Sequence, residues 1–319
     1  MSARDSRFAA ALRNRVQGAV KEAEPLARYS TFRIGGPATL LMAAGAADVG
    51  VALEACIESG VSWFVLGLGS NILLPDEGLD ALVIRIGKGM DRIQGDGARW
   101  RLGAGLPAPL AARKTAEAGW AGLHVMVGVP GSVGGGIYMN AGCHGAEWSD
   151  SIRTVTVARG EGEVVTLGRD AIPFSYRRSG LDHCVVLEAE VELRAESPER
   201  LTEEVNHLFR WRQEGTPFNQ PCCGSTFKNP DRSPAGENGK PMTAGQLIEA
   251  AGLKGHLIGG VQVSPKHANY FVNAGSGTAA DVRALIQLAK ETVRDRFGVE
   301  LETEVKLVGM DGRNLEMDR

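Results

Sequence analysis

The sequence predicts an α+β protein with more than one domain, and three observations lead to this prediction. Strand and helix signals alternate near the N-terminus, paired strand signals dominate the middle, and mixed signals return towards the C-terminus. The 319 residues are more than one typical core needs and indicate two or three domains. Glycine, with 42 copies gathered in a few loops, indicates turns that approach a ligand closely.

The first segment, to about residue 75, alternates extended and helical signals. Residues 30–44 are expected to be extended. Residues 46–60 show an amphipathic pattern that predicts a helix ending at Gly60. Residues 63–71 predict a buried strand that runs into a tight turn.

The middle segment is expected to be rich in β-strands. Apolar and polar residues alternate around glycine-containing turns, as they do in hairpins, over residues 79–86, 91–105, 151–168 and 184–195. One helix is expected among these strands, over residues 107–120.

A helical connector over residues 197–215 leads into the third segment. Ser197 suits the N-cap of this helix and Pro198 its first turn. Further along, residues 243–253 predict a short helix and residues 267–275 a strand.

The chain is expected to end with a long helix and a strand. Thr278 and Asp281 resemble a capping box, and Gly298 fits the position after a helix that ends at Phe297. Residues 299–309 alternate and predict the final strand. One face would carry Leu301, Thr303, Val305 and Leu307, and the other Glu302, Glu304 and Lys306.

The stretch GLGSNILLPDEG, residues 67–78, begins like a dinucleotide-binding fingerprint but does not complete it. Ile72 stands where the third glycine is needed, and Pro75 and Gly78 break the helix that should follow. The turn at residues 67–71 either cradles an anion with successive N–H groups or is an ordinary tight turn. The sequence leaves both interpretations open.

A second glycine-rich stretch, VGVPGSVGGGIYMNAGCHG, covers residues 127–145. It is expected to be a loop, because its glycines punctuate it too often for a helix and its apolar residues argue against a disordered linker. Backbone so bare of side chains suits a large flat or phosphorylated ligand. Two such loops together would suit a long dinucleotide.

Composition excludes several classes of protein. The formal net charge of −3 gives no electrostatic footprint for nucleic acid or for an anionic membrane. The N-terminal residues show no secretory signal pattern, and the longest apolar stretch is shorter than the ~20 residues of a membrane span. A cytoplasmic location is therefore expected.

The cysteines are expected to be reduced thiols. Their number is 5, no C-x-x-C pair occurs, and a bridge between the neighbours Cys222 and Cys223 would be strained. Neither a disulfide framework nor a metal site is indicated. Cys223 is expected to pack as a small residue and not to react.

Eight motifs, in order and in register, give the sequence a specific resemblance. It is similar to the UDP-N-acetylenolpyruvoylglucosamine reductases over about residues 25–309, and the absence of a tyrosine-bearing loop insertion places it with the shorter, type II members. The motifs are YSTFRIGGPA, VLGLGSNILLPDEGLDALVIRI, GVPGSVGGGIYMNAG, SYRRSG, CGSTFKNP, AGQLIEAAGLKG, VSPKHANYFVNAG and LETEVKLVG.

The resemblance implies a flavoenzyme of peptidoglycan synthesis. FAD would be held non-covalently by a two-domain module of the vanillyl-alcohol-oxidase (PCMH-like) type, and a C-terminal α/β domain would bind the substrate. NADPH would be the hydride donor in the reduction of UDP-N-acetylglucosamine enolpyruvate to UDP-N-acetylmuramate. The expected partners are thus two small molecules, the UDP-sugar and NADPH, and a monomer is favoured.

The implied domains follow the three segments. Residues 1–75, with the last strand at 300–319, would form the first flavin-binding subdomain. Residues 76–205 would form the second, and residues 206–299 the UDP-sugar-binding domain.

The resemblance also assigns three catalytic residues. Arg177 would grip the substrate carboxylate, on which charge builds, and Arg178 is the alternative. Ser225 would give a proton to the adjacent carbon. Glu304 would support that step, with Glu302 as the alternative.

Further residues are assigned to binding, and no metal is expected. The cofactor-binding residues would be Arg33, Gly35, Gly67, Gly69, Ser70, Asn71, Gly131, Ser132 and Gly134. The substrate-binding residues would be Tyr176, Arg212, Lys228, Asn229 and Lys266 or His267.

Two other functions are weighed against this one. A related flavin oxidase of an alcohol or sugar would not need the GSTFKNP or ETEVK motifs. A nucleotide-sugar-binding protein without turnover would not need Arg177, Ser225 and Glu304 together.

Overall fold

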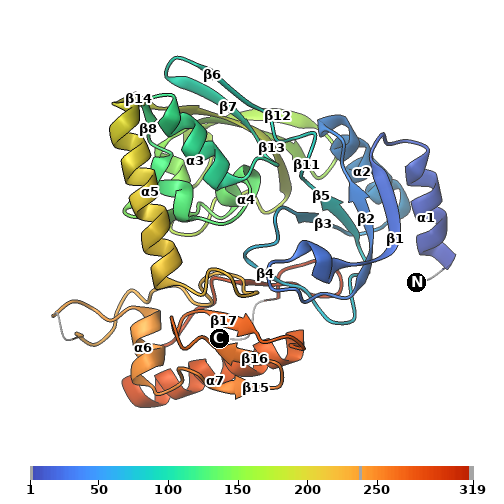
Figure 1. Cartoon of the computed structure of the whole chain (residues 1–319). Coiled ribbons are helices and arrows are strands. Elements are labelled where there is room, and N and C mark those ends of the chain that lie inside the picture. Colours follow the sequence, from blue (N-terminus) through green and yellow to red (C-terminus); the bar gives the residue numbers. More distant parts are fainter. Residues whose placement is uncertain (1–2, 237–238, 316–319) are drawn as a thin grey trace. The chain divides into compact units, whose positions relative to one another are not determined.

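The computed structural model describes residues 3–236 and 239–315 and divides the chain into two compact units (Figure 1). Unit 1 comprises the chain up to Glu24, Ala38–Leu68 and Leu79–Trp211. Unit 2 comprises Pro25–Pro37, Gly69–Gly78 and the chain from Arg212 onwards. Each unit has its own apolar core. The three domain boundaries expected from the sequence stay a prediction.

The first sheet of unit 1 is four-stranded, in the order β1-β2-β5-β3. β2 and β3 each run parallel to β5. The helix α2 packs against β5 and ends where Gly60 adopts a left-handed conformation, as the sequence predicts. The bounds are α1 Ala3–Arg13, β1 Ala19–Pro25, β2 Pro37–Met42, α2 Ala46–Ser59, β3 Trp63–Leu66 and β5 Leu82–Arg85.

The second sheet of unit 1 is antiparallel and five-stranded, in the order β12-β11-β13-β7-β6. It contains the predicted hairpins β6–β7 and β11–β12, and α4 contacts both β7 and β13. The bounds are β6 Ile93–Asp96, β7 Arg99–Gly103, α3 Ala108–Glu117, α4 Val133–Tyr138, β11 Ile152–Arg159, β12 Val164–Gly168 and β13 Cys184–Glu192.

Several short elements and most of the long helix α5 (Pro198–Gly215) complete unit 1, which ends at Trp211. β8 (Trp120–Ala121) pairs with β14 (Arg194–Ala195), and β9 (Gly142–Cys143) pairs with β10 (Ala146–Glu147). The helix α5 begins as predicted, since the Ser197 hydroxyl accepts a hydrogen bond from the N–H of Arg200. The 3₁₀ turns of unit 1 are η2 His124–Gly128, η3 Trp148–Asp150 and η4 Arg169–Ala171, whereas η1 (Leu26–Tyr29) belongs to unit 2.

The second glycine-rich stretch is not the continuous loop expected from the sequence, because its middle forms α4. The Ser132 side chain caps this helix by accepting a hydrogen bond from the N–H of Gly135 at 3.4 Å. A Cβ at Gly134 would lie 2.9 Å from the Cβ of Ala104, and one at Gly136 would lie 2.3 Å from Nε1 of Trp148. These glycines therefore allow the helix to pack closely, and the cost of glycine in a helix is outweighed.

Unit 2 combines a three-stranded antiparallel sheet, β15-β16-β17, with two helices and a separate strand pair. The long helix α7 begins with the predicted capping box of Thr278 and Asp281 and ends at Gly298. The bounds are β4 Ile72–Leu73, α6 Ala244–Ala250, β15 Leu257–Ile258, β16 Val261–Val263, β17 Phe271–Asn273, α7 Ala279–Phe297 and β18 Lys306–Leu307.

The predicted final strand is much shorter than expected. Only Lys306–Leu307 is a strand, and it pairs in parallel with β4, far away in the sequence. Leu301 and Val305 are buried as the alternation requires, but Thr303 and Glu304 are both half-buried. Within the described ranges, no helix is long and apolar enough to cross a membrane.

Substituting Gly136→Ala should destabilise unit 1. The added methyl group would lie against the fully buried Trp148 ring, and overpacking of this kind costs about 1–3 kcal/mol. Thermal unfolding followed by circular dichroism would measure the loss. Gly160→Ala is the matched control, because a Cβ there meets nothing within 4 Å. Equal melting temperatures for the two variants would contradict the expectation.

Candidate active site

Ser225 lies on an irregular segment of unit 2 that two other segments hold in place. The N–H of Thr226 donates to the carbonyl of Asn269 at 2.7 Å, and the N–H of Glu304 donates to the carbonyl of Thr226 at 2.8 Å. Phe227 also forms a bridge with Thr303. The predicted residues Ser225 and Glu304 are therefore brought close together by backbone hydrogen bonds.

The side chain of Asn269 completes this arrangement. Its Oδ1 accepts from the N–H of Phe227 at 2.9 Å, and its Nδ2 donates to the carbonyl of the same residue at 2.8 Å. Asn269 is 5% exposed, so these groups are satisfied away from water. The amide thus fixes the segment that carries Ser225.

The turn after Leu68 joins the same site through its unit 2 residues. Nδ2 of Asn71 donates to the backbone carbonyl of Glu304 at 3.1 Å, and the N–H of Lys306 donates to the carbonyl of Asn71 at 3.0 Å. A Cβ at Gly224 would lie 3.8 Å from the carbonyl oxygen of Ser70. Ser70 and Asn71, predicted to bind cofactor, therefore lie beside the predicted catalytic residues of unit 2.

Thr31 connects this turn to the cysteine segment. Its N–H and its hydroxyl donate to the carbonyl of Gly69 at 3.0 and 3.2 Å, and the hydroxyl also lies 2.6 Å from the carbonyl of Cys222. Two residues on, Arg33 has φ +58° and Gly35 has φ +142°. A Cβ at Gly35 would lie 3.0 Å from Cβ of Leu74, so this position requires glycine.

Tyr270 is a polar neighbour of Ser225 that the sequence did not single out. Burial raises the pKa of Tyr270, while the charge of Arg212 and a hydrogen bond with Ser225 lower it. The Tyr270 ring also contacts the ring of His267, 4.9 Å away between centroids. The predicted substrate residue His267 therefore contacts the ring of Tyr270, and the charge of Arg212 acts on the Tyr270 hydroxyl.

The other predicted substrate residues of unit 2 have partners within the protein. Lys228 forms an ion pair with Glu302, and the Nζ of Lys266 donates to the carbonyl of Gln213 at 2.8 Å. Oδ1 of Asn229 accepts from the N–H of Ala244 at 3.1 Å, at the start of α6. Their substrate contacts stay predictions.

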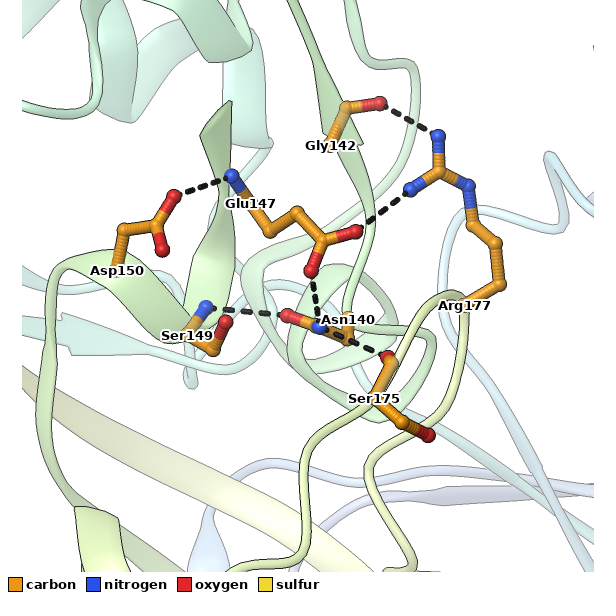
Figure 2. A network of polar contacts seen from close by, with 7 residues as sticks. All are labelled: Asn140, Gly142, Glu147, Ser149, Asp150, Ser175 and Arg177. Carbon is orange, nitrogen blue, oxygen red and sulfur yellow. Dashed lines mark hydrogen bonds and ion pairs between the residues drawn. The ribbon is translucent and has the colours of Figure 1, made fainter. Parts of the chain in front are cut away.

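Arg177 lies in unit 1, in a tight turn closed by backbone hydrogen bonds between Ser175 and Arg178. Its Nη1 donates to Oε1 of Glu147 at 3.3 Å and its Nη2 to the carbonyl of Gly142 at 3.0 Å (Figure 2). Its guanidinium carbon lies 4.6 Å from the centroid of the Tyr176 ring. This is a cation with a fixed orientation, as carboxylate recognition requires.

The remaining predicted cofactor residues also lie in unit 1, where the two glycine stretches meet. A Cβ at Gly67 would lie 2.7 Å from Oγ of Ser132. The backbone forms an antiparallel β-bridge between Pro107 and Ser132, with hydrogen bonds donated by the N–H groups of Ala108 and Val133. The N–H groups of Gly131 and Ser132 do not take part in this bridge. Gly67 and Ser132 are therefore close neighbours, and the contacts of these residues with the flavin stay a prediction.

Two family models match the chain. The model for the C-terminal domain of UDP-N-acetylenolpyruvoylglucosamine reductase matches residues 216–308, and the model for an FAD-binding domain matches residues 37–168. A UDP-N-acetylenolpyruvoylglucosamine reductase 1 from Bacillus anthracis is 40% identical over 92% of this chain and 95% of its own length. The chain belongs to the UDP-N-acetylenolpyruvoylglucosamine reductase family.

Two further members of this reductase family support the assignment. The protein of that name from Rubrobacter xylanophilus is 43% identical over 91% of this chain and 96% of its own. The crystal structure of the reductase from Thermus caldophilus is 31% identical, with a TM-score of 0.76 over 91% of this chain and 99% of that chain. The predicted α+β fold, with a flavin-binding module and a C-terminal domain, is confirmed, and so is FAD as cofactor.

Three residues of the site were missed at the sequence level. Tyr270 lies in the quoted motif HANYFVNAG, and Asn140 and Glu147 lie in or just after the second glycine-rich stretch. Each has a partner that is distant in the sequence, so no local pattern identifies it. The one available signal was that Glu147 is a charged residue close to a glycine-rich stretch.

The cysteines form no disulfide, and burial suppresses the reactivity of the thiol next to Ser225. Burial raises the pKa of Cys223 well above its usual range and that of Cys56 to about 12. Cys223 is 1% exposed, which fits the prediction that it packs and does not react.

Cys56 and Cys223 should therefore resist a thiol reagent in the folded protein at pH 8. The reactive thiolate forms only as pH rises through the pKa, and both raised values lie above that pH. Peptide mass spectrometry after timed iodoacetamide treatment would measure the reaction, with the half-buried Cys184 as internal comparison and denatured protein as positive control. Labelling of Cys223 as fast as in the denatured protein would contradict this expectation.

Proposed function

We propose that this protein is an NADPH-dependent reductase that converts UDP-N-acetylglucosamine enolpyruvate to UDP-N-acetylmuramate in peptidoglycan precursor synthesis. The observation that carries the proposal is 40% identity over 92% of the chain to a protein named UDP-N-acetylenolpyruvoylglucosamine reductase 1. The cytoplasm is the proposed location, which agrees with cysteines that form no disulfide.

FAD is the cofactor, and when bound it supplies the hydride chemistry. In unit 1, the proposed residues are Gly67, Gly131, Ser132 and Gly134. In unit 2, the proposed residues are Arg33, Gly35, Gly69, Ser70 and Asn71.

Arg177 would bind the carboxylate of the enolpyruvyl group. Reduction at the terminal carbon of the C=C bond builds negative charge on that carboxylate, so a fixed cation lowers the barrier more than it strengthens substrate binding. The planar guanidinium stays charged and matches two carboxylate oxygens, which an ammonium does not.

Ser225 would donate the proton from Oγ to the carbon beside the carboxylate, which completes the lactyl ether. A hydroxyl is a weak acid, but the carbon is strongly basic at that moment and the donor is held in place. The hydrogen bond with Tyr270 and the backbone contacts of Thr226 orient Oγ. Glu304 is joined to the same segment by the hydrogen bond from its N–H to the carbonyl of Thr226. Its carboxylate would keep the surroundings of Ser225 polar during this proton transfer.

The UDP part of the substrate calls for cations and polar groups. Arg212 and His267 lie around Tyr270, and burial lowers the pKa of His267, so its ring is neutral near pH 7. Tyr176, Lys228, Asn229 and Lys266 are the other proposed contacts.

A spectroscopic experiment tests the function. The purified protein should be yellow, and its flavin absorbance should bleach with NADPH and recover when UDP-N-acetylglucosamine enolpyruvate is added without oxygen. Recovery with oxygen alone would indicate an oxidase. A colourless protein would contradict any flavin-dependent activity.

Ser225→Ala should separate the two halves of the reaction. Flavin reduction by NADPH should survive, whereas reoxidation by the enolpyruvyl substrate should fall by roughly 100-fold or more, since general acid catalysis contributes about 10²–10⁴. Stopped-flow absorbance measures both rates. Ser233→Ala is a control, because the Ser233 hydroxyl donates to the carbonyl of Met242 in the same unit. Normal substrate turnover in Ser225→Ala would remove this residue from the mechanism.

A further inference from the structure

Glu147 contacts Arg177 from the hairpin formed by β9 and β10. The side chain of Arg177 is 15% exposed and that of Glu147 is 30% exposed, so the pair is shielded more than a surface ion pair. The same hairpin supplies the carbonyl of Gly142, the second acceptor for the guanidinium (Figure 2). The β9–β10 hairpin therefore supplies the acceptors for both Nη1 and Nη2 of Arg177.

Both carboxylate oxygens of Glu147 accept hydrogen bonds. Oε1 faces Arg177, and Oε2 accepts from Nδ2 of Asn140 at 2.7 Å. A glutamine in this position would keep only one acceptor and would turn an amide N–H₂ towards one of two donors. The site thus requires a carboxylate, and its isostere does not replace it.

Asn140 links Glu147 to the turn that carries Arg177. Its Nδ2 also donates to the carbonyl of Ser175 at 2.9 Å, and its Oδ1 accepts from the N–H of Ser149 at 3.1 Å. Asn140 is 1% exposed, so each of these contacts is made in the interior. The amide fixes the backbone of the turn, and Glu147 fixes the side chain at its tip.

The backbone around this network is held in an unfavourable conformation. Asn140 has φ +42° and Arg177 has φ +58°, in the left-handed region that side chains other than glycine rarely adopt. Such residues persist when their surroundings hold them and gather at functional sites. The contacts of Asn140 and Glu147 supply that constraint.

We propose that Glu147 is a positioning residue for Arg177, supported by Asn140, and that it sets the orientation in which the guanidinium meets the substrate carboxylate. The role of Arg177 in this statement rests on the proposed function. Since the cation is ordered before the substrate arrives, less conformational freedom is lost when the reacting complex forms. The effect of Glu147 should therefore appear in the step that builds charge on the carboxylate.

The first test is a kinetic comparison of Glu147→Gln with the wild type. Reoxidation of reduced flavin by the enolpyruvyl substrate should slow by roughly 10- to 100-fold, the usual effect of losing a hydrogen bond to a charged group. kcat should fall more than KM rises. Flavin reduction by NADPH should stay within about twofold of the wild type. Equal slowing of both half-reactions would overturn the proposal.

A double-mutant cycle shows whether Glu147 acts through Arg177. In the Arg177→Lys background, Glu147→Gln should cost no more than about threefold, because the side chain it positions is gone. A cost in that background as large as in the wild type would overturn the proposal. Glu163→Gln is the matched control, since it breaks another Arg–Glu pair of unit 1, at 3.1 Å to Arg159, and should change neither rate.

Chemical modification tests the positioning without any turnover. Phenylglyoxal should modify Arg177 several-fold faster in Glu147→Gln than in the wild type, while the exposed neighbour Arg178 reacts equally in both. Equal rates for Arg177 in both proteins would overturn the proposal. If the wild type fails to reduce the enolpyruvyl substrate, the proposed function fails, and this measurement still decides whether Glu147 holds Arg177.

Glu147→Asp covers the case in which the glutamine variant does not fold. It keeps the charge and both acceptor oxygens but reaches less far by one methylene group. Melting temperature and flavin content establish folding. A folded aspartate variant should slow substrate reduction and show the same dependence on Arg177. Wild-type rates in that variant, or loss of folding in both variants, would indicate a purely structural role and overturn the proposal.

Discussion

The geometry around Ser225 depends on one buried side chain, the amide of Asn269. The segment that carries Ser225 is irregular and has only isolated bridges at Cys222 and Phe227, so its backbone groups lack the partners of a regular strand. The side-chain amide of Asn269 pairs with the N–H and the carbonyl of Phe227, and the backbone carbonyl of Asn269 accepts from the N–H of Thr226. Because an unsatisfied buried polar group costs about 1–3 kcal/mol, this side chain holds the segment in a single position. Ser225, Tyr270 and Glu304 take their places from it.

Local signals explain what the sequence predicts correctly about the fold. The helix ends at Gly60, Ser197, Thr278 and Gly298 are set by residues within one turn of each end, so they can be read without knowing the rest of the chain. The hairpins β6–β7 and β11–β12 are equally local.

Contacts between distant segments explain what the sequence could not predict. The last strand pairs with β4, more than two hundred residues away, and the glycines of α4 allow that helix to pack closely against Trp148 and Ala104. The candidate site behaves in the same way. Ser225, Glu304 and Arg177 could be assigned from family motifs, but Tyr270, Asn140 and Glu147 act through partners that no motif places beside them.

The chain path of unit 2 has a consequence for biosynthesis. Residues 25–37 and 69–78 leave the ribosome early, but the rest of their core begins only at Arg212. The core of unit 2 therefore cannot form until the chain beyond Arg212 has been made. Until then the apolar side chains of Phe32, Ile34 and Leu73, which are buried in the folded protein, lack their core partners. Contacts of such long sequence separation form slowly, and apolar segments that stay exposed during that time are prone to aggregation.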